Sequence, residues 1–161
     1  MAELGAPEAK LGEVFEVNPP ARRLVQALGK RFAAGPGVLL AIDYGHDRAA
    51  VGDTLQAVRS HQPVPALQTP GEADLTAHVD FSALMRAAEP AKASPVIGQG
   101  AFLRRLGIEL RAERLAASRP DKADDLISGC HRLINPAGMG TLFKVLAVSS
   151  PDLPDLPGLA P

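Results

Sequence analysis

The sequence of 161 residues predicts an α/β fold. Apolar residues recur at helical spacing over residues 21–32, which indicates an amphipathic helix that ends at Gly35-Pro36-Gly37. A continuous apolar run follows at residues 38–42, too short for a helix and bounded by glycines. Such a run is typical of a strand buried on both faces, as in a parallel sheet. Ligands of these sheets bind beyond the carboxyl ends of the strands, which places Asp43 and Tyr44 at a candidate site.

The composition fits one domain with an aliphatic core. Aromatic residues make up only 4% of the chain, whereas glycine and proline supply 15 residues each. The 17 basic and 18 acidic groups are interspersed and leave a net charge of −1, which offers no electrostatic footprint for nucleic acid. The longest apolar run is far shorter than the roughly 20 residues of a membrane span. A single cysteine, Cys130, excludes an internal disulfide and indicates a reducing compartment.

The remaining elements are predicted from periodicity and turn residues. Residues 13–18 alternate polar and apolar, which indicates a short half-buried strand that Pro19 and Pro20 end. Asp80 is placed to cap a helix over residues 81–88. The pattern is completed by a short strand at residues 95–97, a helix from Phe102 to Gly107, a helix over residues 121–134 with Cys130 in the core, and a closing strand at residues 139–148.

Three segments lack such periodicity. Residues 52–80 are predicted to form a long loop, and loops of about thirty residues are usually functional or disordered. Residues 1–12 are expected to be a disordered or boundary segment, which leaves residues 13–150 as the domain. Prolines recur at every third position after residue 150, the period of polyproline II, so residues 151–161 are predicted to be a flexible tail.

The stretch at residues 70–81 gathers the most reactive side chains. Three carboxylates, a histidine and a threonine lie just before the predicted helix; they are Glu72, Asp74, Thr76, His78 and Asp80. One interpretation is solvated loop charge with a helix cap at Asp80. The other is a site for acid–base chemistry or for a cationic substrate.

A two-histidine, one-carboxylate iron site is a further alternative. His78 and Asp80 form a His-x-Asp pair, and His131 could supply the third ligand. The spacing of two places both ligands on one face only in a strand, whereas Asp80 is expected to cap a helix. The iron oxygenase is therefore the weakest of the hypotheses.

The order of several motifs resembles the MidA-like S-adenosylmethionine-dependent methyltransferases. The residues that carry the resemblance are Ile42-Asp43-Tyr44-Gly45-His46, Gly52-Asp53-Thr54-Leu55 with Arg59 and His61, the stretch at 70–81, Gln99 with Phe102-Leu103, Leu106-Gly107-Ile108, Leu133-Ile134-Asn135-Pro136, and Met139-Gly140 with Phe143. The resemblance implies the C-terminal part of a Rossmann-like class I methyltransferase sheet, its fifth to seventh strands with helices. Residues 38–42 would form the fifth strand and residues 141–148 the antiparallel seventh.

The resemblance also implies an activity: transfer of a methyl group from S-adenosyl-L-methionine to an arginine of a protein, in the family's mitochondrial member a subunit of respiratory complex I. A guanidinium must be held and oriented by carboxylates. Asp43, Glu72 and Asp74 are the predicted guanidinium-orienting residues, with Tyr44, Thr76, His78 and Arg59 as substrate-binding neighbours. The location would be cytoplasmic in a bacterium and mitochondrial in a eukaryote.

The family's glycine-rich cofactor loop and ribose-binding acid precede anything that aligns with this sequence. We therefore expect no cofactor-binding residue in this chain and no activity from the chain alone. We expect no metal ligand either. The alternative is a non-enzymatic interaction module that binds a basic partner through the acidic stretch. A half-sheet would expose strand edges, which predicts self-association.

Overall fold

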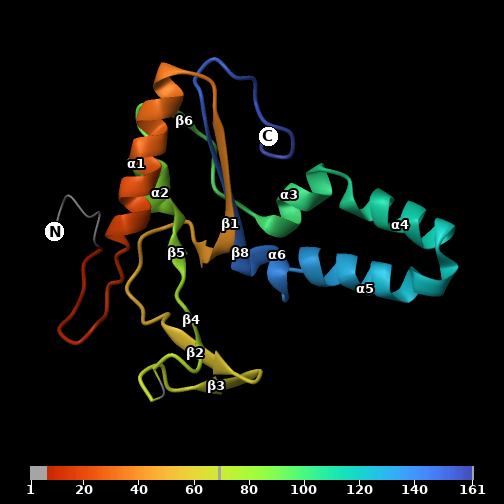
Figure 1. Ribbon diagram of the computed structural model, residues 1–161, viewed down its shortest axis with the longest axis horizontal. Coiled ribbons are helices and arrows are strands. Elements are labelled where there is room, and N and C mark those ends of the chain that lie inside the picture. Colours follow the sequence, from red (N-terminus) through yellow and green to blue (C-terminus); the bar gives the residue numbers. More distant parts are fainter. Residues whose placement is uncertain (1–6, 69, 161) are drawn as a thin grey trace.

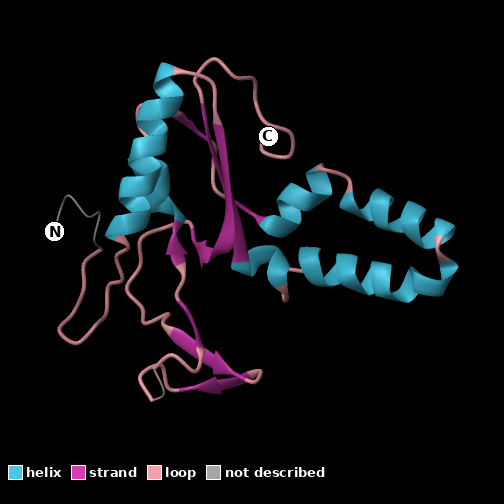
Figure 2. Cartoon of the chain, viewed as in Figure 1, coloured by secondary structure: helices cyan, strands magenta, loops and turns pink. Residues whose placement is uncertain are grey.

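The computed structural model describes residues 7–68 and 70–160, and its centre is a mixed β-sheet (Figures 1 and 2). β1 (Val38–His46) pairs along its length with the antiparallel β8 (Phe143–Ser149), in a register that runs from Val38 opposite Ser149 to Tyr44 opposite Phe143. β5 (Val79–Asp80) pairs in parallel with the last two residues of β1. On the other side of β8 lie β6 (Lys92–Ala93) and β7 (Ile97–Gly98), both antiparallel to it.

Both faces of β8 are covered by apolar side chains. α1 (Pro19–Ala34) and α2 (Phe81–Ala87) pack on one face, where Phe81, Leu146 and Val148 are fully buried. On the other face, α3 (Gln99–Arg105) and the segment after β8 enclose Val145 and Ala147. The alternation along β8 follows from the two-residue period of a strand. The mixed α/β fold is therefore as the sequence predicted.

A helical hairpin extends away from the sheet (Figure 1). It consists of α4 (Ile108–Ser118), the short 3₁₀ helix η2 (Pro120–Lys122) and α5 (Ala123–Ile134), and α6 (Met139–Leu142) leads from it into β8. The predicted helix at 121–134 is confirmed as α5, but Cys130 is half-buried and does not lie in the core. α4 was not predicted. The predicted closing strand at 139–148 begins with the helical turn α6.

Residues 52–80 contain a second, three-stranded sheet where the sequence predicted a loop. β2 (Gln56–Arg59), β3 (Gln62–Val64) and β4 (Asp74–Thr76) are antiparallel neighbours in the order β3-β2-β4. Each strand has only three or four residues, too few for a periodic signal. Ser60 and His61 connect β2 to β3 with positive φ values of 51° and 63°, as a tight hairpin turn requires.

The predicted strand at residues 13–18 is wrong, because these residues form neither helix nor strand. The prolines begin α1 instead of ending a strand: Pro19 and Pro20 occupy its first turn, and the Asn18 side chain accepts a hydrogen bond from the Ala21 N–H. Proline suits this position because its missing N–H would have no partner in the helix.

The strand predicted at residues 38–42 is confirmed as part of β1, but its burial on both faces is not. Val38, Leu40 and Ile42 are 41–48% exposed, whereas the intervening Leu39 and Ala41 pack against the core. Its long pairing is antiparallel, with β8, and the parallel pairing is confined to β5. One face of β1 is thus apolar and accessible.

Several local predictions at helix ends are confirmed. The Asp80 carboxylate caps α2 by accepting from the Ala83 N–H at 3.0 Å. The short strand predicted at 95–97 is present, one to two residues later, as β7. Gly107 follows α3 with a φ of 77°, a conformation that favours glycine.

The terminal segments depart from a simple picture of flexible ends. Residues 1–6 lie outside the described residues, and residues 7–12 form neither helix nor strand. Residues 151–160 run back along the sheet, where Leu159 is buried against Phe102 and Asp155 pairs with Lys92 at 2.6 Å. The proline spacing could not predict this packing, because it indicates only the backbone conformation and not the contacts of the side chains. Among the residues that the structure describes, no helix is long and apolar enough to cross a membrane.

Candidate functional site

A cavity of about 340 Å³ lies between the end of β1 and the three-stranded sheet. It is lined by Tyr44 of β1, Gln56 and Val58 of β2, Asp74 and Thr76 of β4, His78, and Leu142 of α6. Four of the predicted site residues, Tyr44, Asp74, Thr76 and His78, therefore meet at one place.

The pairing of β2 with β4 explains which side chains reach this cavity. Gln56 lies opposite Thr76, and Val58 lies opposite Asp74. Residues directly opposite each other, and residues two apart, share one face of a sheet. This face presents the Asp74 carboxylate and the Thr76 hydroxyl to the cavity, and both residues are exposed.

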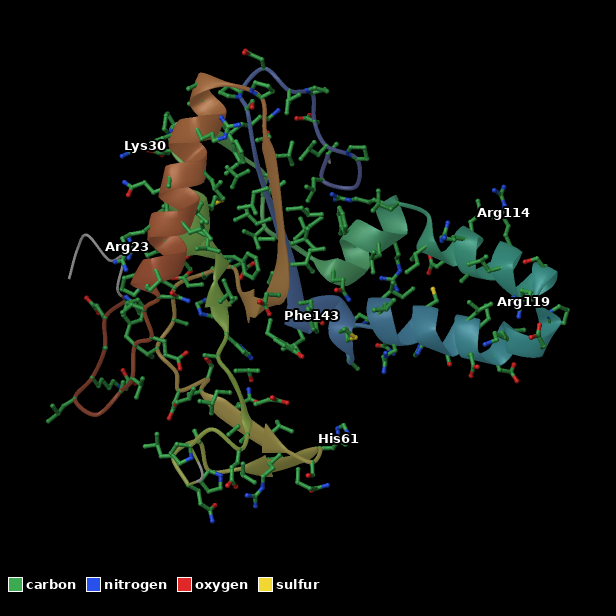
Figure 3. All side chains as sticks on the ribbon, viewed as in Figure 1. Arg23, Lys30, His61, Arg114, Arg119 and Phe143 are labelled. Carbon is green, nitrogen blue, oxygen red and sulfur yellow. The ribbon has the colours of Figure 1, made fainter. Side chains whose placement is uncertain are left out.

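Tyr44 forms the wall on the side of the main sheet. Its ring packs against Phe143, with 4.3 Å between centroids and planes tilted by 41°, because the two residues are opposite each other in the β1–β8 register. Phe143 marks the start of β8 in Figure 3, whereas His61 marks the outer tip of the three-stranded sheet. The cavity thus lies at the carboxyl end of β1.

Three of the predicted residues do not line this cavity. Asp43 precedes Tyr44 and so points to the opposite face of β1; its Oδ1 accepts the Tyr44 N–H at 2.8 Å. Arg59 and Glu72 are paired with each other, Nη1 to Oε2 at 3.1 Å, with side chains 47% and 66% exposed. This ion pair links the end of β2 to the segment before β4.

A second cavity, of about 170 Å³, lies beside the first and shares His78 with it. Its polar lining comprises Glu16, Asn18, Arg22, His46, His78 and Asp80. The Nδ1 atom of His46 lies 2.6 Å from the Arg48 carbonyl oxygen and 4.0 Å from Asp80 Oδ1. Glu16 and His46 are not among the predicted site residues, although His46 belongs to a motif that carries the family resemblance. His46 could have been predicted, because it lies two residues after Tyr44 at the carboxyl end of β1 and residues two apart share one face of a strand. No local sequence pattern singles out Glu16.

The hypothetical iron ligands are not brought together. His131 lies on α5, where its Nε2 is 3.1 Å from the Asn135 side-chain nitrogen. Within residues 7–68 and 70–160, no group of three or more His, Cys, Asp or Glu side chains could hold a metal ion.

Gly98 and Gly100 make close contacts within this chain and do not form a cradle for a cofactor. Gly98 and Gly100 flank the β7–α3 junction, but a Cβ at either position would lie 2.7 Å from the Gly140 carbonyl oxygen or 2.5 Å from that of Ile134. These glycines therefore allow α3 to pack closely on α6 and the end of α5. The described residues do not fit a cofactor loop at this junction.

Comparison with known proteins gives consistent matches. Residues 2–98 match the family model described as "Putative S-adenosyl-L-methionine-dependent methyltransferase". The mouse mitochondrial protein arginine methyltransferase NDUFAF7 is 40% identical over 139 residues, which cover 84% of this chain and 32% of the relative. The human protein of that name is 36% identical over 156 residues, which cover 89% of this chain and 35% of the relative. This chain thus spans about a third of these curated relatives.

Solved structures agree with these matches. A Burkholderia thailandensis protein superimposes with a TM-score of 0.86 at 29% identity, over 99% of this chain and 44% of that one. A crystal structure of a protein from the same organism, with bound S-adenosyl-homocysteine, gives a TM-score of 0.85 at 29% identity. The match covers 99% of this chain and 43% of that one.

Proposed function

Because this chain belongs to the family of S-adenosyl-L-methionine-dependent methyltransferases, we propose that it supplies the substrate-binding side of a protein arginine methyltransferase. The observation that carries the proposal is the cavity in which Asp74 and Thr76 face Tyr44. S-adenosylmethionine supplies the methyl group in this family. The residues of this chain bind and orient the acceptor.

The chemistry of the cavity suits a guanidinium. A carboxylate forms charge-assisted hydrogen bonds to guanidinium N–H groups and can accept two of them at once, which fixes the plane of the group. An aromatic ring beside the carboxylate favours a cation over its face. Asp74 and Tyr44 provide this pair, and the Thr76 hydroxyl and His78 ring are hydrogen-bonding neighbours. An arginine held in one orientation needs less ordering to reach the transition state.

The finer parts of the proposal rest on the resemblance and on the relatives. A protein with an exposed arginine is the substrate, and a subunit of respiratory complex I is the target class that the resemblance suggests. The names of the mouse and human relatives place those proteins in the mitochondrion. The proposed location of this protein is the mitochondrion in a eukaryote and the cytoplasm in a bacterium. We further propose that the cofactor is held by sequence outside the matched third of the relatives, so the chain alone is inactive.

Self-association belongs to the same proposal. Among the described strands, β1 pairs over residues 38–44 with β8 alone, and its accessible face carries Val38, Leu40 and Ile42. A free strand edge beside an apolar face is a template for another strand. A second copy of this chain can pair there.

Binding of an arginine peptide tests the proposed site. We expect Asp74→Asn to weaken binding by about tenfold, equivalent to about 1.4 kcal/mol, because the charge-assisted hydrogen bonds are lost. Titration of a short arginine-containing peptide, followed by NMR or calorimetry, measures this. The matched control is Asp47→Asn, an exposed carboxylate that follows β1 and lies outside both cavities.

The expected control result is unchanged affinity for Asp47→Asn. Equal losses for the two variants would show that the peptide responds only to overall charge. Wild-type protein that binds lysine and arginine peptides equally well would contradict recognition of a guanidinium.

A further inference from the structure

Thr54 lies where three segments distant in sequence meet. The β2–β4 ladder ends with Gln56 opposite Thr76, and two residues beyond these stand Thr54 and His78. The His78 N–H donates to the Thr54 Oγ1 at 2.9 Å. A side-chain oxygen thereby continues the antiparallel ladder in place of a backbone carbonyl.

Glu16 completes this junction from the N-terminal side. Its Oε1 accepts the Thr54 N–H at 3.0 Å, and its Oε2 accepts a short hydrogen bond from the Thr54 hydroxyl. The Thr54 hydroxyl thus acts as a hydrogen-bond donor to Glu16 and as an acceptor from His78. Nearby, the Gly52 N–H donates to the Val14 carbonyl oxygen at 2.8 Å.

The junction replaces secondary structure that is missing there. Residues 13–18 and 49–55 form neither helix nor strand. β2, β3 and β4 pair only with one another among the described strands, and they extend from the main sheet in Figure 1. Among the described strands, no ladder joins the two sheets, and the shortest link to β1 is through the two residues that separate β4 from β5. The hydrogen bonds of Thr54 with Glu16 and His78 are partly buried, and they hold the three-stranded sheet at the end nearest to β1.

We propose that Glu16 and Thr54 are positioning residues that hold Asp74 and Thr76 opposite Tyr44. The inference rests on the proposed function, because it concerns the cavity assigned there to the arginine side chain. His78 transmits the effect: its backbone N–H is held by Thr54, and the residue lines both cavities. Loss of the junction leaves each strand intact and lets the three-stranded sheet move as a unit.

The Thr54→Val and Thr54→Ser pair tests this role. Valine keeps the shape of threonine but removes the hydroxyl, whereas serine keeps the hydroxyl. We expect Thr54→Val to expose the His78 amide to solvent exchange, to shift the NMR signals of Tyr44 and Asp74, and to weaken arginine-peptide binding by about fivefold. Thr54→Ser should restore all three towards wild type. Glu16→Gln should give an intermediate result, because an amide oxygen accepts a weaker hydrogen bond.

The outcomes separate this inference from the proposed function. If wild-type protein does not bind the peptide, the proposed function fails, while His78 exchange and the Tyr44 and Asp74 signals still decide the positioning role. If Thr54→Val leaves these signals and peptide affinity unchanged, the positioning role is wrong. A melting transition lowered equally by valine and serine, with unchanged affinity, would assign Thr54 to stability alone.

Discussion

The two sheets of this molecule are held together by different forces. In the main sheet, residues 145–148 of β8 are at most 2% exposed, and apolar side chains cover both faces of this strand. In the three-stranded sheet, only Ala57 is buried. The first sheet owes its stability to the burial of aliphatic surface, which is worth about 25 cal/mol per Å². The second depends on its backbone ladder and on a few polar contacts.

On the proposed function, this difference separates stability from recognition. The main sheet provides a fixed frame that ends at Tyr44, and the second sheet brings Asp74 and Thr76 to it. Side chains in the frame determine whether the protein folds, whereas side chains on the second sheet can vary with little effect on folding. Substitutions that are matched between the sheets test this division.

The largest expected effect comes from truncation of a leucine in each sheet. Leu146 is fully buried, whereas Leu75 is 57% exposed. We expect Leu146→Ala to lower the free energy of unfolding by about 2–5 kcal/mol through lost burial and the cavity left behind, and Leu75→Ala by less than about 1 kcal/mol. Urea denaturation followed by circular dichroism measures both. Similar losses would show that the two sheets share one core.

A smaller effect is expected at the point where β1 meets β5. A Cβ on Gly45 would lie 2.3 Å from the Val79 carbonyl oxygen and 2.8 Å from the Phe81 ring, whereas a Cβ on Gly52 would meet nothing within 4 Å. Gly45→Ala should cost about 1–3 kcal/mol through overpacking. Gly52→Ala should be neutral or slightly stabilising. Thermal melts of the two variants measure the contrast, and a neutral Gly45→Ala would mean that β5 is not packed against β1.

The same division explains part of what could be predicted from the sequence. The helices α1 and α2 have strong apolar patterns because they bury surface, and both were predicted. Residues 38–42 and α5 were predicted from their apolar patterns too, although every second residue of 38–42 is exposed and α5 buries only Ile134. β2, β3 and β4 were missed because a strand of three or four residues that buries almost nothing leaves no such pattern. α4 was not predicted; like α5 it has a single buried residue, so burial does not explain why one helix was predicted and the other was missed.

The candidate site was found only in part, for a related reason. Asp74, Thr76 and His78 are two residues apart and attracted attention as a local cluster of polar groups. Gln56 and Val58 join them through antiparallel pairing, which depends on a register that single-sequence patterns do not encode. Glu16 reaches the site across 38 residues of chain through a side-chain hydrogen bond. Such contacts exist only once the fold has formed.

The smallest expected effect concerns Glu72, which the sequence placed among the guanidinium-orienting residues. Its partner is Arg59, and both side chains are largely exposed, so solvent screens their attraction. Glu72→Gln should therefore change the free energy of unfolding by less than about 0.5 kcal/mol and leave arginine-peptide affinity close to wild type. Denaturation and the peptide titration used for Asp74→Asn measure the two quantities. A loss of affinity as large as that of Asp74→Asn, at unchanged stability, would show that the second sheet binds the substrate with its tip as well as with the face towards Tyr44.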